Sequence, residues 1–210
     1  MASDRQSRKR LATRQSISNA ATRLFLERGF DHVTVDDIAA AADVGRMTVF
    51  NHFPRKEDMF FDRDEEGRAL LHDVLRQRDT GVSPIDTLRL LAHQLVTEQS
   101  PYVTFSADSM GFMATIDGSI TLKARARAIR DELAQVVALA LAECVGREAN
   151  DPAAQLAAHL LLATWSVALV QAHQRYRQGR DVAAAQAVFL ALVDQGSCGL
   201  TAAMAGTPYA

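Results

Sequence analysis

The sequence predicts an all-α protein built from about nine helices. Ala, Leu, Arg, Gln and Glu, which favour helices, are frequent along the 210-residue chain. No run of residues alternates strictly between apolar and polar side chains, as a half-buried strand would. Three of the five prolines, Pro84, Pro101 and Pro152, stand where a helix can begin. We expect helices at 8–28, 35–42, 46–52, 56–78, 84–99, 102–115, 119–146, 152–178 and 181–197, and a loose tail over 199–210.

The composition predicts a globular chain of the reducing cytoplasm. Apolar residues make up 48% of the chain and charged residues 23%, which is enough apolar material for a sizeable core. Cys144 and Cys198 lie far apart and show no metal-binding spacing, so we expect no disulfide framework, metal site or cofactor. The N-terminus lacks the apolar region of a signal peptide, and the most apolar stretch, 156–170, is too short for a bilayer, so no membrane partner is expected.

The first helix is expected to bury one face and to carry positive charge. Its apolar residues recur at helical spacing from Ile17 to Phe25, and Gly29 stands where a helix can end in a left-handed conformation. The net charge of the chain is −2, yet residues 1–30 hold seven basic and two acidic side chains. Such asymmetry suits a phosphate backbone, or else a solvated N-terminus.

Two short helices joined by a tight turn are predicted next. Thr34 can cap the second helix, and Asp37 can complete a capping box. The turn at 43–45 leads directly into the helix at 46–52, which is the spacing of a helix-turn-helix. A helix of this width fits the major groove of B-DNA and contacts base edges mainly through its N-terminal residues.

The outward face of the helix at 46–52 carries side chains that suit base edges. Arg46 can form a two-pronged contact with a guanine, and Thr48 or Met47 can touch a thymine methyl group. We expect double-stranded DNA to meet Arg46, Met47, Thr48, Asn51 and His52.

The motifs RLFLERGF, VTVDDIA, VFNHF and KEDMF lie in order within TRLFLERGFDHVTVDDIAAAADVGRMTVFNHFPRKEDMF. This stretch resembles the DNA-binding domain of the tetracycline-repressor (TetR) family. The resemblance implies that Thr34 and Lys56 contact phosphates at the starts of two helices. It also implies a palindromic operator, read by a homodimer with two-fold symmetry.

Four positions depart from the family pattern. Asp43 stands where glycine usually makes the turn, and Gly45 stands where a serine often caps the recognition helix. Met47 places a bulky apolar group on the DNA-facing side, where a small residue is common. Phe50 replaces the usual tyrosine, so a hydroxyl that would reach a phosphate is missing. These changes affect base readout and leave the domain assignment unchanged.

The remainder of the chain is expected to sense a small apolar or amphipathic molecule. Bulky apolar side chains concentrate around Gly111, and the chain holds a single tryptophan. Pockets between helices are often lined in this way, although each such residue can equally belong to the ordinary core. The predicted ligand-binding residues are His93, Phe105, Met110, Phe112, Met113 and Trp165.

The last two helices predict a dimer interface. The stretches over 152–178 and 181–197 are apolar on more than one face, so each must be buried on more than one side. In the family the resemblance suggests, these two helices form a four-helix interface between two copies of the chain. We therefore divide the chain into a DNA-binding domain, 1–54, and a sensing and dimerisation domain, 55–210.

These expectations combine into a transcription regulator. By resemblance it is a repressor that a ligand releases from its operator, acting through the helix at 56–78. An activator of the same architecture remains an alternative, as does a helical ligand-binding protein or small enzyme without a DNA role. No Ser/His/Asp set or glycine-rich phosphate loop is recognisable, so we do not expect an enzyme.

Overall fold

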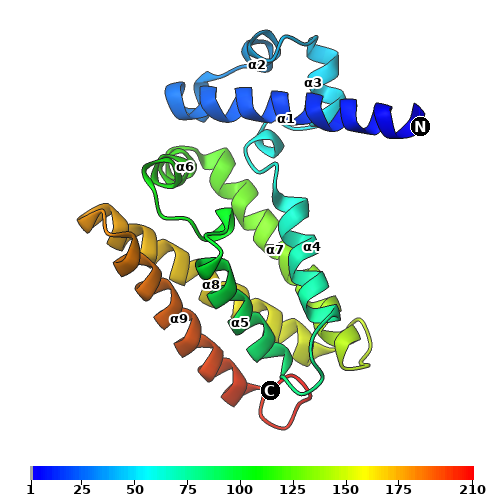
Figure 1. Cartoon of the computed structure of the whole chain (residues 1–210), viewed down its shortest axis with the longest axis vertical. Helices are drawn as coiled ribbons and strands as arrows, with labels where there is room; N and C mark the ends of the chain where they lie inside the picture. Colours follow the sequence, from blue (N-terminus) through cyan, green and yellow to red (C-terminus); the bar gives the residue numbers. More distant parts are fainter. Residues whose placement is uncertain (1) are drawn as a thin grey trace. The chain divides into compact units, whose positions relative to one another are not determined.

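The computed structural model describes residues 2–210, with side chains from residue 6 onward. The described chain is all-helical, as predicted, with nine α-helices and three short 3-10 helices. It divides into two compact units (Figure 1). Unit 1 comprises Met1–Asp64 and Gly111–Ala126, and unit 2 comprises Glu65–Met110 and Arg127–Ala210. The predicted division at residue 54 differs from these units because residues 111–126 pack with the N-terminal helices.

Unit 1 is built on a small aromatic core. Phe25 lies 4.9 Å from Phe30 and 5.9 Å from Phe60, measured between ring centroids. Val49 and Phe53 of the third helix and Leu122 from the later segment are fully buried in the same core. The helices of the N-terminal part are α1 (Ala2–Arg28), η1 (Phe30–His32), α2 (Val35–Ala41), α3 (Arg46–His52) and η2 (Glu57–Met59).

The predicted local signals around α2 and α3 are confirmed. Thr34 and Asp37 form a reciprocal capping box, in which the Asp37 amide donates to the Thr34 hydroxyl over 3.1 Å. Gly29 has a φ of 82°, so the chain leaves α1 in a conformation that favours glycine. Asp43 has a φ of 52° in the turn, where aspartate tolerates the left-handed region better than most residues. Gly45 precedes α3 without a side-chain cap, as its identity requires.

Unit 2 is a helical bundle dominated by its last two helices. α8 and α9 lie side by side over most of their length, and α5 packs against α9 (Figure 1). The two helices approach closely at Gly196, where a Cβ atom would lie 2.2 Å from Thr164 Cγ2. The elements after η2, of which α6 and α7 lie partly in unit 1, are α4 (Asp64–Arg76), α5 (Pro84–Thr97), η3 (Pro101–Val103), α6 (Ala107–Gly118), α7 (Ile120–Cys144), α8 (Pro152–Gly179) and α9 (Val182–Ala203).

Three predicted elements differ from the structure: the helix over 56–78, the loose tail, and the helix over 102–115, which is divided between η3 and α6. The helix expected over 56–78 begins only at Asp64, after a 3-10 turn at Glu57–Met59. Acidic side chains there anchor the chain: the Ser18 hydroxyl donates to Asp62, and Arg125 lies 3.9 Å from Asp64.

The C-terminal tail is not loose. α9 continues to Ala203, and Tyr209 is completely buried. The Tyr209 hydroxyl donates to Asp151 over 3.1 Å. Burial, the hydrogen bond and the negative charge of Asp151 raise the pKa of Tyr209 to about 12. The tail therefore docks onto the start of α8.

Candidate DNA-binding face and sensing unit

The outward face of α3 is the most prominent candidate site of unit 1. Arg46, Met47 and Asn51 are exposed, with 71% of Met47 accessible to solvent. Thr48 and His52 are half-buried beside them, while Val49 is fully buried beneath. A seven-residue helix with one anchored face presents its other face to a groove.

Arg14 of α1 holds the end of α3 in place. Its Nη1 donates to the His52 carbonyl over 2.6 Å, and its guanidinium lies 4.1 Å from the centre of the Phe53 ring. A cation at a helix C-terminus satisfies an otherwise unpaired carbonyl. Burial, and then the positive charges of Arg10 and Arg14, lower the pKa of His52, so its ring is neutral at neutral pH.

Arg46 is oriented by an aspartate of the preceding helix. Its Nη1 lies 2.6 Å from Asp36 Oδ2, and its guanidinium lies 5.5 Å from the centre of the Phe50 ring. Both partners of the ion pair are more than half exposed, so the pair adds little to stability. Asp36 instead affects where the Arg46 guanidinium points.

Lys56 and Thr34 are engaged within unit 1. Lys56 Nζ donates to the carbonyls of Phe30 and Val33, both at 2.9 Å, and lies 4.1 Å from the centre of the Phe30 ring. Burial lowers the pKa of Lys56, although the nearby acidic groups Asp31 and Glu57 oppose this. The hydroxyl of Thr34 belongs to the capping box described above. Both side chains therefore stabilise unit 1, in addition to any contact that they make with phosphate.

Replacing Lys56 with methionine is expected to lower the free energy of unfolding by about 2 kcal/mol, because two carbonyls lose a charged donor. Chemical denaturation followed by circular dichroism measures this. Arg55→Met is the matched control, since it removes the same charge from an exposed neighbouring residue. Equal effects of the two substitutions would contradict a structural role for Lys56.

The predicted ligand-binding residues fall in both units. Phe105, Met110 and Trp165 pack into the core of unit 2. Phe112 and Met113 belong to unit 1, where the Phe112 ring stacks on Phe60 at 4.2 Å between centroids. The structure therefore does not gather the predicted residues into one cluster.

His93 is occupied by an ion-pair network at the surface of unit 2. Its Nε2 lies 2.9 Å from Asp194 Oδ1, and Arg89 lies 3.5 Å from the same oxygen. Burial acts to raise the pKa of Asp194, but the hydrogen bonds and charges of His93 and Arg89 outweigh it and lower that pKa. His93 thus joins α5 to α9.

Four rings form an aromatic cluster in the core of unit 2. The Phe105 ring meets His173 edge-on at 5.1 Å between centroids, and Trp165 meets Phe189 edge-on at 6.0 Å. Phe105 and Phe189 are 6.4 Å apart and connect the two pairs. No spacing in the sequence links Phe189 to Phe105, because the two residues come from separate segments of the chain.

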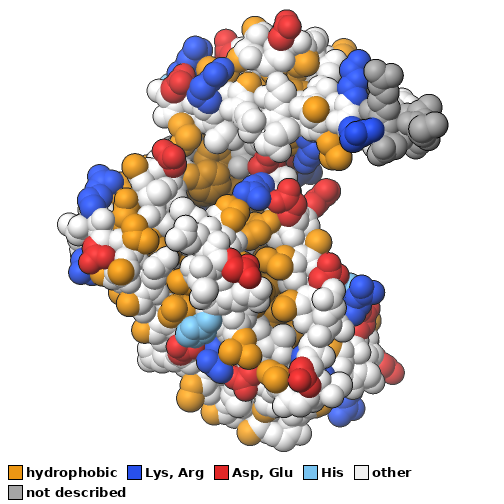
Figure 2. Space-filling view, in the orientation of Figure 1, with side chains coloured by type: hydrophobic (Ala, Val, Ile, Leu, Met, Phe, Trp, Pro, Cys, Tyr) orange, Lys and Arg blue, Asp and Glu red, His pale blue; other side chains and the backbone are white. Residues whose placement is uncertain are grey.

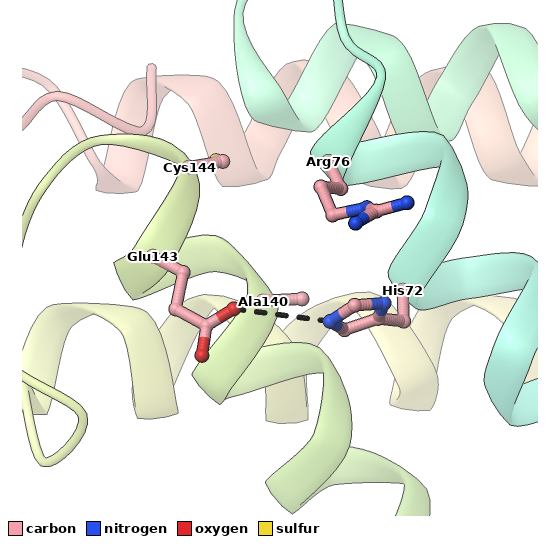
Figure 3. Close-up of a pocket in the computed structure, with 5 residues that line it drawn as sticks. All are labelled: His72, Arg76, Ala140, Glu143 and Cys144. Carbon is pink, nitrogen blue, oxygen red and sulfur yellow. Dashed lines mark ion pairs between the residues drawn. The ribbon is translucent and has the colours of Figure 1, made fainter.

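A small surface pocket of about 170 Å³ lies between α4 and α7 (Figure 3). His72 Nε2 and Glu143 Oε2 are 3.8 Å apart at its mouth. Burial raises the pKa of the Cys144 thiol, which disfavours the reactive thiolate. Typical sites for small molecules hold roughly 300–1,000 Å³, so this pocket is small for an effector. It is lined by His72, Arg76, Ala140, Glu143 and Cys144.

A stretch of unit 1 matches a known protein family. Residues 17–62, which run from the buried face of α1 through the recognition helix to η2, match the family model for bacterial regulatory proteins of the tetR family. This segment is a tetR-family domain. The match covers every predicted DNA-facing residue, from Thr34 to Lys56.

Curated relatives are similar to the chain over its N-terminal part. The HTH-type transcriptional regulator TcmR of Streptomyces glaucescens is 41% identical over 81 residues, which are 39% of this chain and 36% of TcmR. The HTH-type transcriptional repressor DhaR of Mycobacterium sp. strain GP1 is 44% identical over 48 residues, which are 23% of this chain and 24% of DhaR. The chain thus spans less than half the length of the curated relatives it matches.

Solved structures share the fold over nearly the whole chain. Salmonella enterica GusR has a TM-score of 0.56 at 21% identity, covering 91% of this chain and 95% of GusR. NalD, the secondary repressor of the MexAB-OprM multidrug efflux pump in Pseudomonas aeruginosa, has a TM-score of 0.56 at 20% identity, covering 90% and 96%. SmeT in complex with triclosan has a TM-score of 0.55 at 20% identity, covering 90% and 91%. The fold shared with these structures therefore extends beyond residue 62.

Two residues of unit 1 contact α3 in a way that the sequence pattern does not predict. Asp36 pairs with Arg46 across ten positions, and Arg14 reaches the end of α3 across 38 positions. No local spacing links either pair. Arg14 was visible only as one member of a basic N-terminal segment.

Proposed function

We propose that this protein is a homodimeric DNA-binding transcription regulator without enzymatic activity. Repression released by a small apolar or amphipathic effector is the mode we favour. The observation that carries the proposal is the exposed face of α3, which lies within a matched tetR-family domain and contacts Arg14 and Asp36. The relatives TcmR and DhaR are named as a transcriptional regulator and a transcriptional repressor, which supports this function.

DNA recognition would divide between base-reading and phosphate-binding side chains. Arg46, Met47, Thr48 and Asn51 would meet base edges from the exposed face of α3. Thr34, Phe50, His52 and Lys56 would lie nearer the backbone, which positions a protein without reading its sequence. A two-fold dimer would place two α3 helices in successive major grooves, about 34–36 Å apart on a palindromic operator.

The dimer would form through α8 and α9. Leu156, Leu160, Val167 and Val170 lie on one side of α8, and between 40% and 54% of each side chain is exposed. Figure 2 shows apolar side chains along the edge of unit 2 where Figure 1 places α9. Exposed apolar surface of this extent on two neighbouring helices suits a partner copy.

By length and composition alone, α8 and α9 could each cross a membrane. The apolar faces proposed for the dimer account for this composition. We favour the dimer because the two helices pack on each other and on α5, and because Asp194 and Arg89 form an ion-pair network on that bundle. A cytoplasmic location follows from this proposal. Bacterial regulators must reach the chromosome.

An effector would act by binding one arrangement of the dimer better than the other. The related fold of SmeT has been solved with triclosan, an aromatic molecule, which supports an apolar effector class for unit 2. The chain passes between the units three times, at residues 64/65, 110/111 and 126/127. Two of these passages fall inside α6 and α7, so a change in unit 2 would reach unit 1 along continuous helices.

The direct test is a gel shift with the DNA that flanks the gene for this chain. We expect a salt-sensitive complex whose site is a palindrome by footprinting. Failure to select any site from a random-sequence DNA pool would overturn the proposed function.

Arg46→Ala is expected to relax base preference at one position of each half-site, costing roughly 1–3 kcal/mol there if the contact is bidentate. Competition gel shifts with single-base operator variants measure this. Arg55→Ala serves as control, because the loss of an exposed charge weakens binding to all sequences alike. An unchanged preference in Arg46→Ala would exclude Arg46 from base readout.

A further inference from the structure

Two buried nitrogen atoms in the aromatic cluster of unit 2 lack hydrogen-bond partners among the described residues. They are Trp165 Nε1 and His173 Nδ1. Buried polar groups in folded proteins are almost always hydrogen-bonded, because an unpaired group has lost its hydrogen bonds to water without forming new ones. Two such atoms in one cluster indicate a place where another molecule supplies the missing bonds.

The two nitrogens belong to one environment. Both side chains come from α8, eight residues or about 12 Å apart along the helix axis. The Phe105 ring contacts His173, the Phe189 ring contacts Trp165, and these two phenylalanines are 6.4 Å apart. An aromatic ring therefore lies beside each of the two side chains, and the two rings are near each other.

We propose that this cluster binds the effector, and that the effector is an uncharged aromatic molecule carrying a hydrogen-bond-accepting oxygen. The proposal rests on the proposed function, in which unit 2 is the sensor. It moves the polar end of the site from His93, which is engaged by Asp194, to Trp165 and His173. It also leaves Phe112 outside the site, because that ring packs in unit 1.

The chemistry of the two nitrogens defines the ligand class. An indole N–H can only donate, so its partner must be an acceptor. An imidazole nitrogen donates or accepts according to its tautomer, so a hydroxyl group satisfies it in either state. Burial lowers the pKa of His173, which keeps the ring neutral and leaves an anionic ligand without a countercharge from it. A phenol or an aromatic ketone meets these requirements, whereas a carboxylate does not.

The single tryptophan makes the site directly observable, because the chain has one indole ¹H–¹⁵N signal. Three probes of nearly equal size separate the alternatives: 2-naphthol, naphthalene without an oxygen, and anionic 2-naphthoate. We expect 2-naphthol to shift the indole proton downfield and to bind roughly tenfold more tightly than naphthalene in calorimetry. Equal affinities, tighter binding of 2-naphthoate, or an indole signal unmoved at saturating 2-naphthol would overturn the proposal.

Substitutions test which side chains cause the preference for 2-naphthol over naphthalene. Trp165→Phe and His173→Phe keep an aromatic ring and remove one nitrogen each, so the preference for 2-naphthol over naphthalene should shrink in both. His159→Phe is the matched control on an exposed position of the same helix and should keep the full preference. Full preference in all three variants would contradict the site, and the experiment on the unchanged protein remains decisive if a variant does not fold.

Operator binding by the ligand-free protein separates this inference from the proposed function. A protein that binds its operator but shows no preference for 2-naphthol overturns the ligand class alone. A protein that shows the preference but selects no DNA keeps the site and overturns the DNA-binding proposal.

Discussion

Replacing Val167 or Leu160 with glutamate is expected to produce monomers and to weaken operator binding about 100-fold or more, because two linked half-site contacts become independent. Both side chains are exposed on one side of α8, at 54% and 40%. A charge there costs the single chain little, but it would be buried without a partner in the proposed interface. Sedimentation velocity measures the oligomeric state, and a gel shift measures affinity on the full palindrome.

Gln155→Glu is the matched control, since it adds the same charge to an exposed position of α8 outside this apolar side. It should stay dimeric. Ala168 is unsuitable for such a test because it is completely buried within its own chain, whereas Ala187 on α9 is exposed. Intact dimers in Val167→Glu, Leu160→Glu and Ala187→Glu would place the interface elsewhere.

Gly196→Ala is expected to lower the free energy of unfolding by roughly 1–3 kcal/mol through overpacking, despite the better helix propensity of alanine. The added Cβ atom would lie 2.2 Å from Thr164 Cγ2, 2.7 Å from its Oγ1 and 3.0 Å from its Cβ. Thr164 is β-branched, and its hydroxyl donates to the Leu160 carbonyl over 2.9 Å, so it has little freedom to move away. Thermal and chemical denaturation measure the loss.

Gly199→Ala, three residues along the same helix, supplies the control. Nothing lies within 4 Å of a Cβ atom built there, so this substitution should be neutral or stabilising. Combining Gly196→Ala with Thr164→Ala should recover part of the stability, because two of the three close atoms disappear. A Gly196→Ala variant as stable as Gly199→Ala would show that α8 and α9 separate at little cost.

The local parts of the fold were predictable because their causes are local. The Thr34 capping box, the positive φ of Gly29 and the bounds of α3 all follow from residues within a few positions of one another. The tetR-family resemblance rested on the same short stretch, and the family model matches residues 17–62.

The parts of the fold that were not predicted depend on contacts between segments that are distant in the sequence. Periodicity alone extended one helix across 56–63, where Asp58 and Asp62 are instead held by Arg125 and Ser18. Tyr209 was predicted to lie in a loose tail, whereas it is buried and its hydroxyl donates to Asp151, 58 positions away. The contacts of Phe112 with Phe60 and Phe61 were likewise not predictable from its neighbours in sequence, and its place in a ligand pocket stays a prediction.

The threading of residues 111–126 into unit 1 bears on how such regulators can be recombined. Leu122 is fully buried in the unit 1 core, Ser119 donates to Asp31 over 3.0 Å, and Arg125 donates to Asp58 over 3.0 Å. A chimera that joins the first 64 residues to a foreign sensor would lack these contacts and expose Phe60. A graft that also carries residues 111–126 would keep them. The natural unit of exchange in this protein is therefore two pieces of chain rather than one.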